Sequence, residues 1–108
     1  FFVEQPAGVG FSYSEVEDDY INGNGDGRAA VDNFHVIEQF FDRFPEKRKN
    51  DFYIASESFG GHYIPHLTKE ILDRNTNGAF NFRGFLLGNP YVEPVSNIVE
   101  MFNTFYYH

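Results

Sequence analysis

The stretch DFYIASESFGGHYIP, residues 51–65, contains a predicted strand, a turn and the start of a predicted helix. Its first five residues, DFYIA, have the aromatic and β-branched character of a buried strand. Residues 59–75 have helical character, and Pro65 lies near the start of that helix, where a missing backbone N–H costs little. Ser58 lies between the two elements. It is either a nucleophile held on a sharp turn or a serine that caps the helix.

Further strands and helices are predicted on both sides of this junction. Residues 1–4, FFVE, and residues 82–89, FRGFLLGN, have the apolar character of buried strands, and residues 96–108 are predicted to be helical. With the strand at residues 51–55, the order is β-α-β-α-β, and the long connections predict parallel strands with right-handed crossovers. The fold class is therefore α/β. Because three strands leave open sheet edges, we expect a further segment, absent from this sequence, to cover at least one edge.

An amphipathic helix is predicted before the strand at residues 51–55. Its apolar residues recur at steps of three and four, namely Ala30, Phe34, Ile37, Phe41 and Phe44. Asp26 is the expected N-cap of this helix and Pro45 its expected stop. The stripe is wide and aromatic, which predicts that the helix packs on a sheet. Residues 5–28 form a long loop of the kind that is usually functional or packed against a larger fold.

Length, charge and cysteine content exclude several classes of function. The chain has 108 residues, which allows at most one small domain. Its formal net charge of −8 disfavours nucleic acids and anionic membranes as partners. No apolar run approaches the ~20 residues that span a bilayer. The chain has no cysteine, which excludes internal disulfides, thiolate zinc sites and a cysteine nucleophile.

Ser58 occupies the centre of a five-residue pattern that is typical of hydrolytic enzymes. In α/β-hydrolases, the nucleophile sits in a Gly-x-Ser-x-Gly turn between a strand and a helix. Here the run is Ser-Glu-Ser-Phe-Gly, residues 56–60, so Ser56 replaces the first glycine. Serine is still small, and we expect the turn to form with ~1 kcal/mol of extra strain. On this short match alone, the nucleophile and the capping serine explain Ser58 equally well.

Three long segments resemble the serine carboxypeptidase family, which has the α/β-hydrolase fold. They read FFVEQPAGVGFSYS, FPEKRKNDFYIASESFGGHYIPHL and FRGFLLGNPYVEP, and they occur in the order that the family shows. The resemblance extends from Phe1 to the closing FYYH. It implies that residues 1–108 are a partial α/β-hydrolase domain, which begins after the family's glycine-rich oxyanion segment and stops before its catalytic Asp and His.

The resemblance implies a role for each residue of the turn. Ser58 would be the nucleophile of a serine-type carboxypeptidase, which forms an acyl-enzyme while it releases the C-terminal residues of peptides. The backbone N–H of Phe59, which replaces the usual Tyr, would be one oxyanion donor. Glu57 would bind the terminal carboxylate of the substrate. Since two carboxylates in contact repel, one must hold a proton, and binding should be tighter at acidic pH.

The same resemblance sets expectations for cofactors, partners and location. It implies the C-termini of peptides or proteins as substrates and a vacuolar, lysosomal or secreted location. No spacing of His, Asp or Glu suggests a zinc site, and no cofactor is expected. The segment alone lacks a general base for its nucleophile and is expected to be inactive. Two rival functions remain: an acyltransferase of the same family, in which an alcohol accepts the acyl group, and a truncated, non-catalytic homologue that binds a peptide or a partner chain.

Two other groups of residues resemble functional patterns but have structural explanations. His62 follows Ser58 by four residues and would share a helical face with it. A general base must reach the serine hydroxyl from the open side of the turn, so we expect His62 to be structural. Residues 22–27, NGNGDG, resemble the start of a calcium loop, but Asn33 occupies the position of the bidentate Glu. A turn-rich loop that leads into a capped helix is the expected explanation.

Overall fold

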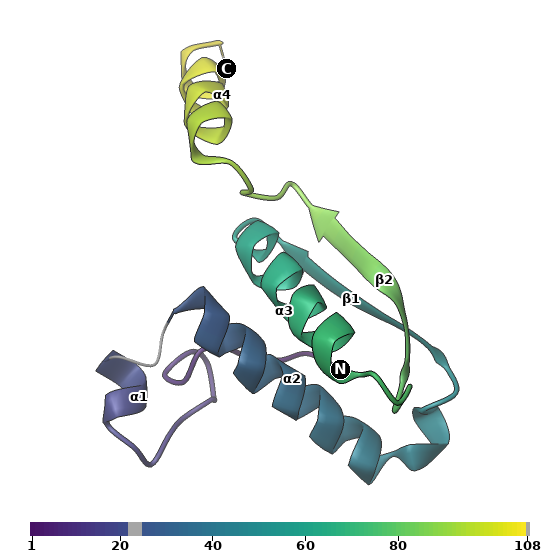
Figure 1. Ribbon diagram of the computed structural model, residues 1–108. Coiled ribbons are helices and arrows are strands. Elements are labelled where there is room, and N and C mark those ends of the chain that lie inside the picture. The colour runs from purple at the N-terminus through teal and green to yellow at the C-terminus, as the bar shows by residue number, and fades with distance from the viewer. Residues whose placement is uncertain (22–24, 108) are drawn as a thin grey trace.

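The computed structural model describes residues 1–21 and 25–107. Its elements in chain order are α1 (Asp18–Ile21), α2 (Asp26–Arg43), the 3-10 helix η1 (Pro45–Lys47), β1 (Asp51–Glu57), α3 (Gly60–Arg74), β2 (Asn81–Gly88) and α4 (Pro94–Tyr107) (Figure 1). The helices and strands predicted from residue 26 onward are therefore confirmed. The whole is a mixture of helices with a small parallel sheet, as an α/β segment requires.

The two strands form a parallel pair with α3 as the connection between them. The register runs from Asp51 opposite Asn81 to Glu57 opposite Gly88, with an irregularity between Phe52 and Tyr53. A parallel pair needs a crossover of this kind, because the chain must return to the same end of the sheet before the second strand starts. The carboxyl ends of both strands consequently meet at one edge, next to the start of α3.

The predicted β-α-β-α-β order is not confirmed, because residues 1–4 form no strand. In the described residues β1 pairs only with β2. The ring of Phe1 instead stacks on the ring of Phe40 in α2, with centroids 4.3 Å apart. A short apolar run shows that a segment packs against something, but it does not distinguish a hydrogen-bonded ladder from aromatic packing on a helix.

The prediction of Asp26 as the N-cap of α2 is wrong. Gly25 holds the cap position with an extended backbone (φ −74°, ψ 147°), and no side chain caps the helix. Asp26 is the first helical residue, where its negative charge still interacts favourably with the helix dipole. The helix ends at Arg43, two residues before Pro45, as the sequence predicts.

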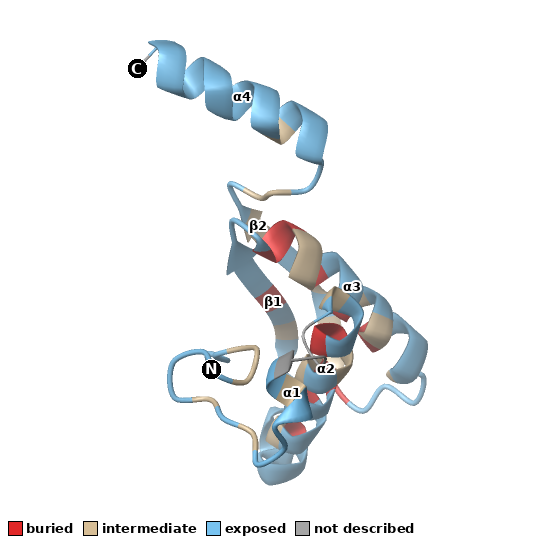
Figure 2. Ribbon diagram, turned by 90° about the vertical axis from the view of Figure 1, so that its left-hand side faces the viewer, coloured by how far each residue is buried: buried red, intermediate tan, exposed pale blue. Residues whose placement is uncertain are grey.

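The core lies where α2 and α3 pack together on one face of the sheet (Figure 2). Phe41 of α2 stacks on Phe80, which precedes β2, with centroids 4.9 Å apart, and meets Phe52 of β1 edge to face at 5.2 Å. The buried apolar side chains of this core are Ala30, Phe34, Ile37, Phe41, Ile54, Ile64, Leu67, Ile71 and Phe80. The aromatic stripe of α2 is therefore buried mainly against α3, and Phe41 reaches the predicted sheet at Phe52.

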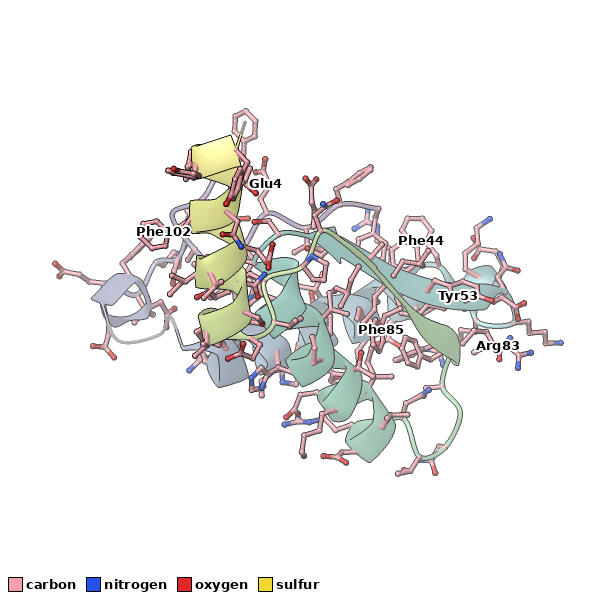
Figure 3. All side chains as sticks on the ribbon, turned by 90° about the horizontal axis from the view of Figure 1, so that it is seen from above. Glu4, Phe44, Tyr53, Arg83, Phe85 and Phe102 are labelled. Carbon is pink, nitrogen blue, oxygen red and sulfur yellow. The ribbon has the colours of Figure 1, made fainter. Side chains whose placement is uncertain are left out.

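Much apolar surface is left exposed outside this core. Tyr53 and Phe85 of the strands and Phe102 of α4 all lie at the surface (Figure 3), and α4 extends away from the other elements (Figure 1). The Cα radius of gyration is 16.2 Å, whereas a compact domain of this length has about 13 Å. None of the described helices combines the length and apolarity needed to cross a bilayer.

Candidate active site

Ser58 lies on a two-residue turn between the end of β1 at Glu57 and the start of α3 at Gly60. Its φ of 54° is left-handed, a conformation that costs a non-glycine residue roughly 1–3 kcal/mol. The residue is exposed at the carboxyl edge of the sheet. The N-cap of α3 is Phe59 and no side chain caps this helix, so the interpretation of Ser58 as a capping serine is wrong.

Backbone hydrogen bonds from the end of β2 hold Ser58 in this conformation. The Ser58 N–H donates to the carbonyl of Gly88 at 3.0 Å. The Ser58 carbonyl accepts from the N–H of Tyr91 at 2.8 Å and from the N–H of Gly61 at 3.0 Å. The end of β2 and the loop that follows it therefore bind both backbone polar groups of the serine. Strained residues persist where the surrounding structure fixes them in this way, and such sites are often functional.

Two glycines allow the chain to turn this sharply. A Cβ on Gly60 would overlap the side chain of Ser56, and a Cβ on Gly61 would lie 2.7 Å from the backbone carbonyl carbon of Tyr91. Ser56 therefore fits the position where the typical pattern has glycine because Gly60 leaves it the space. The expected turn forms with Ser56 in place. We call residues 56–60 the nucleophile turn.

The backbone N–H of Phe59 is available to a ligand. In the described part of the chain it has no hydrogen-bond acceptor, whereas the neighbouring Ser58 and Gly61 N–H groups are both bonded. It belongs to the first N–H groups of a helix, which carry the positive end of the helix dipole. A developing negative charge beside Ser58 would be stabilised by this arrangement.

Three near-parallel rings lie beside the nucleophile turn. The His62 ring stacks on Phe59, with centroids 4.7 Å apart, and on Tyr91 at 5.5 Å. His62 Nδ1 lies 3.8 Å from a carboxylate oxygen of Asp26, and Nε2 is buried without a hydrogen-bond partner in the described structure. Neither ring nitrogen is bonded to the Ser58 hydroxyl, which agrees with the structural role expected for His62.

Glu57 is the last residue of β1 and is exposed next to Ser58. Its carboxylate makes no hydrogen bond or ion pair within the described residues, and its side chain lies over Gly88. A carboxyl group in this place can contact a ligand that reaches Ser58. The roles assigned to Glu57, Ser58 and Phe59 stay predictions.

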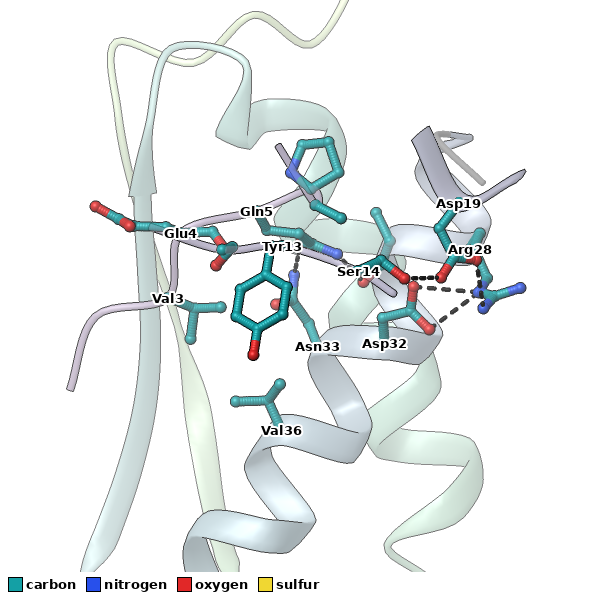
Figure 4. Close-up of a pocket in the computed structure, with 14 residues that line it drawn as sticks. Val3, Glu4, Gln5, Tyr13, Ser14, Asp19, Arg28, Asp32, Asn33 and Val36 are labelled. Atoms are coloured by element: carbon teal, nitrogen blue, oxygen red, sulfur yellow. Dashed lines mark hydrogen bonds and ion pairs between the residues drawn. The ribbon is translucent and has the colours of Figure 1, made fainter. Parts of the chain in front are cut away.

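A cavity with a volume of about 340 Å³ lies elsewhere, between residues 3–14 and α2 (Figure 4). Its polar lining groups bond one another. Asn33 donates to Gln5, which donates to the Ala29 carbonyl at 2.8 Å, and Arg28 pairs with Asp32 at 3.0 Å. No residue of the nucleophile turn lines it. The candidate active site is therefore the exposed turn rather than this cavity.

No group of three or more acidic, His or Cys side chains in residues 1–21 and 25–107 could hold a metal ion. The calcium-loop pattern depends on Asn22 and Asn24, which lie outside the described residues.

Gly88 and Tyr91 were not identified as site residues from the sequence. They follow Ser58 by about 30 positions, and only the parallel pairing of β1 with β2 brings them to it. The one available signal was the prediction of parallel strands, because the carboxyl ends of parallel neighbours meet at one edge.

Comparison with known proteins identifies relatives of the whole chain. The family model described as "Serine carboxypeptidase" matches residues 1–108. Serine carboxypeptidase-like 26 of Arabidopsis thaliana is 40% identical over 107 residues, which are 99% of this chain and 23% of that protein. Serine carboxypeptidase 24 of the same plant is 45% identical over 91 residues, 82% of this chain and 19% of its own length. The chain thus spans about a fifth to a quarter of these relatives, and it belongs to the serine carboxypeptidase family.

Proposed function

We propose that this chain is the nucleophile-bearing segment of a serine-type carboxypeptidase with the α/β-hydrolase fold. The observation that carries the proposal is the left-handed, exposed Ser58 between a parallel strand and a helix. This geometry is what a nucleophile elbow requires. Family membership supports the same reaction, since relatives such as serine carboxypeptidase 24 are named for it.

In the proposed reaction, Ser58 Oγ attacks the scissile carbonyl of a bound peptide. The carbonyl oxygen becomes negatively charged, and the free Phe59 N–H donates a hydrogen bond to it. The C–N bond then breaks, the C-terminal residue leaves with a proton, and the acyl group stays on Ser58 until water hydrolyses the ester. The general base, its orienting acid and a second oxyanion donor would come from segments outside residues 1–108.

Glu57 would recognise the free carboxylate that distinguishes a C-terminal residue from the rest of a peptide. In the proposed complex, Glu57 would lie on the leaving-group side of Ser58. With one proton shared between the two carboxyl groups, Glu57 donates a hydrogen bond to the substrate carboxylate. Peptide or protein C-termini would be the substrates, and the net charge of −8 disfavours nucleic acids and anionic membranes as partners.

The exposed apolar surface supports the proposal that residues 1–108 are part of a larger domain. Phe2 is fully exposed and Tyr53 is 54% exposed on the sheet. Large exposed apolar patches are rare on monomeric soluble proteins, so further sequence would cover them. We place the parent protein in a vacuole, a lysosome or outside the cell, on the family resemblance alone.

The deciding experiment compares the segment with the full-length protein that contains it. A fluorophosphonate probe should label Ser58 in the full-length protein, and Ser58→Ala should abolish the labelling. The isolated segment, which lacks a base, should react at a rate lower by several orders of magnitude. Release of C-terminal residues from free-acid peptides, with water rather than an added alcohol as the acceptor, would separate the carboxypeptidase from an acyltransferase. A full-length protein that neither reacts with the probe nor cleaves peptides would refute the proposal.

A further inference from the structure

We propose that His62 is a positioning residue for the nucleophile turn, which it holds through the rings of Phe59 and Tyr91. The proposal rests on the function proposed above, because it assigns the group that orients the oxyanion donor of that reaction. It goes beyond the structural role expected from the sequence.

The two residues whose rings stack on His62 also have backbone groups at the reaction site. Phe59 follows Ser58 directly and carries the free N–H. Tyr91 donates its N–H to the Ser58 carbonyl at 2.8 Å. Their rings are nearly parallel to each other, with an interplanar angle of 15°, and the His62 ring stacks on each. The side chains therefore connect the two backbone segments that flank the serine.

The exposed Phe59 side chain is held by the rings around it. Phe59 is 45% exposed. Edge contact with Tyr63 at 5.1 Å and stacking on His62 at 4.7 Å fix its orientation. Because the ring is attached to the Cα of Phe59, a ring that is packed in one place restrains this Cα and the adjacent backbone torsions, which set the direction of the N–H. Misplacement of a donor by a small distance weakens its interaction with the transition state.

The His62 ring also lies near a charged group of α2. Nδ1 lies 3.8 Å from Asp26 Oδ2, and Asp26 is the charged group paired with this ring in the described residues. A phenylalanine at position 62 would keep the stacking and avoid the buried, unbonded Nε2. An aromatic ring at position 62 is therefore sufficient to position the turn, and the contact with Asp26 is not needed for this role.

The test uses the full-length protein with the variants His62→Ala, His62→Phe and His66→Ala. His66 is an exposed histidine one turn later in α3 and serves as the matched control. His62→Ala should lower kcat and kcat/KM equally, by about tenfold, equal to ~1.4 kcal/mol of transition-state stabilisation. His62→Phe should restore most of this loss, and His66→Ala should have no effect. If His62→Ala has a lower melting temperature but a kcat within twofold of the wild type, the role of His62 is purely structural and the proposal is overturned.

A second measurement tests the positioning without catalysis. Hydrogen exchange of the Tyr91 amide, which is bonded to Ser58, should be about tenfold faster in His62→Ala and unchanged in His62→Phe and His66→Ala. An unchanged exchange rate in His62→Ala overturns the positioning role whether or not the protein cleaves peptides. A wild-type protein that cleaves nothing, with the expected exchange pattern, would instead refute the proposed function and leave the ring connection established.

Discussion

The backbone N–H of Tyr91 donates a hydrogen bond of 2.8 Å to the backbone carbonyl of Ser58. The loop after β2 thereby holds the turn after β1. The same carbonyl accepts a second bond from Gly61, and the Ser58 N–H is bonded to Gly88. The strained conformation of the serine thus depends on contacts formed about 30 residues away in the sequence.

Removal of the Tyr91 N–H should reduce the reactivity of Ser58. In the full-length protein, Tyr91→Pro eliminates this donor, and we expect labelling of Ser58 by a fluorophosphonate to slow by about fivefold, as loss of one hydrogen bond of ~1 kcal/mol predicts. Tyr91→Phe keeps both the N–H and the ring, and it should react like the wild type. Equal labelling rates for the proline and phenylalanine variants would show that this bond does not hold the serine.

The left-handed backbone at position 58 should reverse the usual stability order of alanine and glycine variants. At most positions glycine is destabilising relative to alanine by ~0.5–1 kcal/mol. With φ at 54°, glycine avoids the steric cost that alanine carries. We therefore expect Ser58→Gly to be more stable than Ser58→Ala by ~1 kcal/mol in urea unfolding. An alanine variant that is the more stable of the two would contradict the left-handed geometry.

The close approach of Gly60 to Ser56 predicts a strongly coupled pair. Gly60→Ala should destabilise the protein by ~1–3 kcal/mol, because the new methyl group overlaps the Ser56 side chain. Ser56→Gly removes the overlapping atoms, so the double variant should recover most of the loss. Urea unfolding of the two single variants and the double variant measures the coupling. Additive changes would mean that the two residues do not touch.

The sequence predicted the elements around the candidate site but not the contacts that hold it. Strand β1 and helix α3 follow from local patterns, namely apolar runs and helical periodicity. The contacts of Ser58 with Gly88 and Tyr91 depend on strand register, which is a long-range property. The aromatic run at residues 1–4 misled the strand prediction, because Phe1 packs on Phe40 instead of joining a ladder. Asp26 does not cap α2 because the helix starts one residue earlier than predicted, with Gly25 at the cap position.

Glu93 should stabilise the start of α4 in a pH-dependent way. Its carboxylate accepts hydrogen bonds from the Ser96 hydroxyl and N–H, both at 2.6 Å, and from the Val95 N–H at 2.9 Å. The bonds from Ser96, followed by that from Val95, lower the pKa of Glu93 below its ordinary value. A lowered folded-state pKa means that the stabilisation is present above the ordinary pKa of Glu and is lost as pH falls through the folded value.

Helicity of residues 94–107, followed by NMR chemical shifts, should accordingly decrease on acidification, and Glu93→Gln should lower it at neutral pH. Glu100→Gln, in the middle of α4, is the matched control and should leave the helix start unchanged. A helix whose first turn is equally formed in the wild type and in Glu93→Gln at neutral pH would contradict the capping role.

The position of Glu57 beside Ser58 leads to a prediction about substrate charge. In the full-length enzyme, KM for a free-acid peptide should rise with pH, because an ionised Glu57 repels the substrate carboxylate. KM for the matching C-terminal amide should change much less. Glu57→Gln cannot ionise, and its amide N–H₂ can still donate to the carboxylate, so its KM for the free acid should lose most of the pH dependence. Steady-state kinetics on the acid and amide pair at several pH values make the measurement. If both enzymes show the same pH dependence toward both peptides, Glu57 does not contact the terminal carboxylate, and carboxypeptidase specificity must arise from another group.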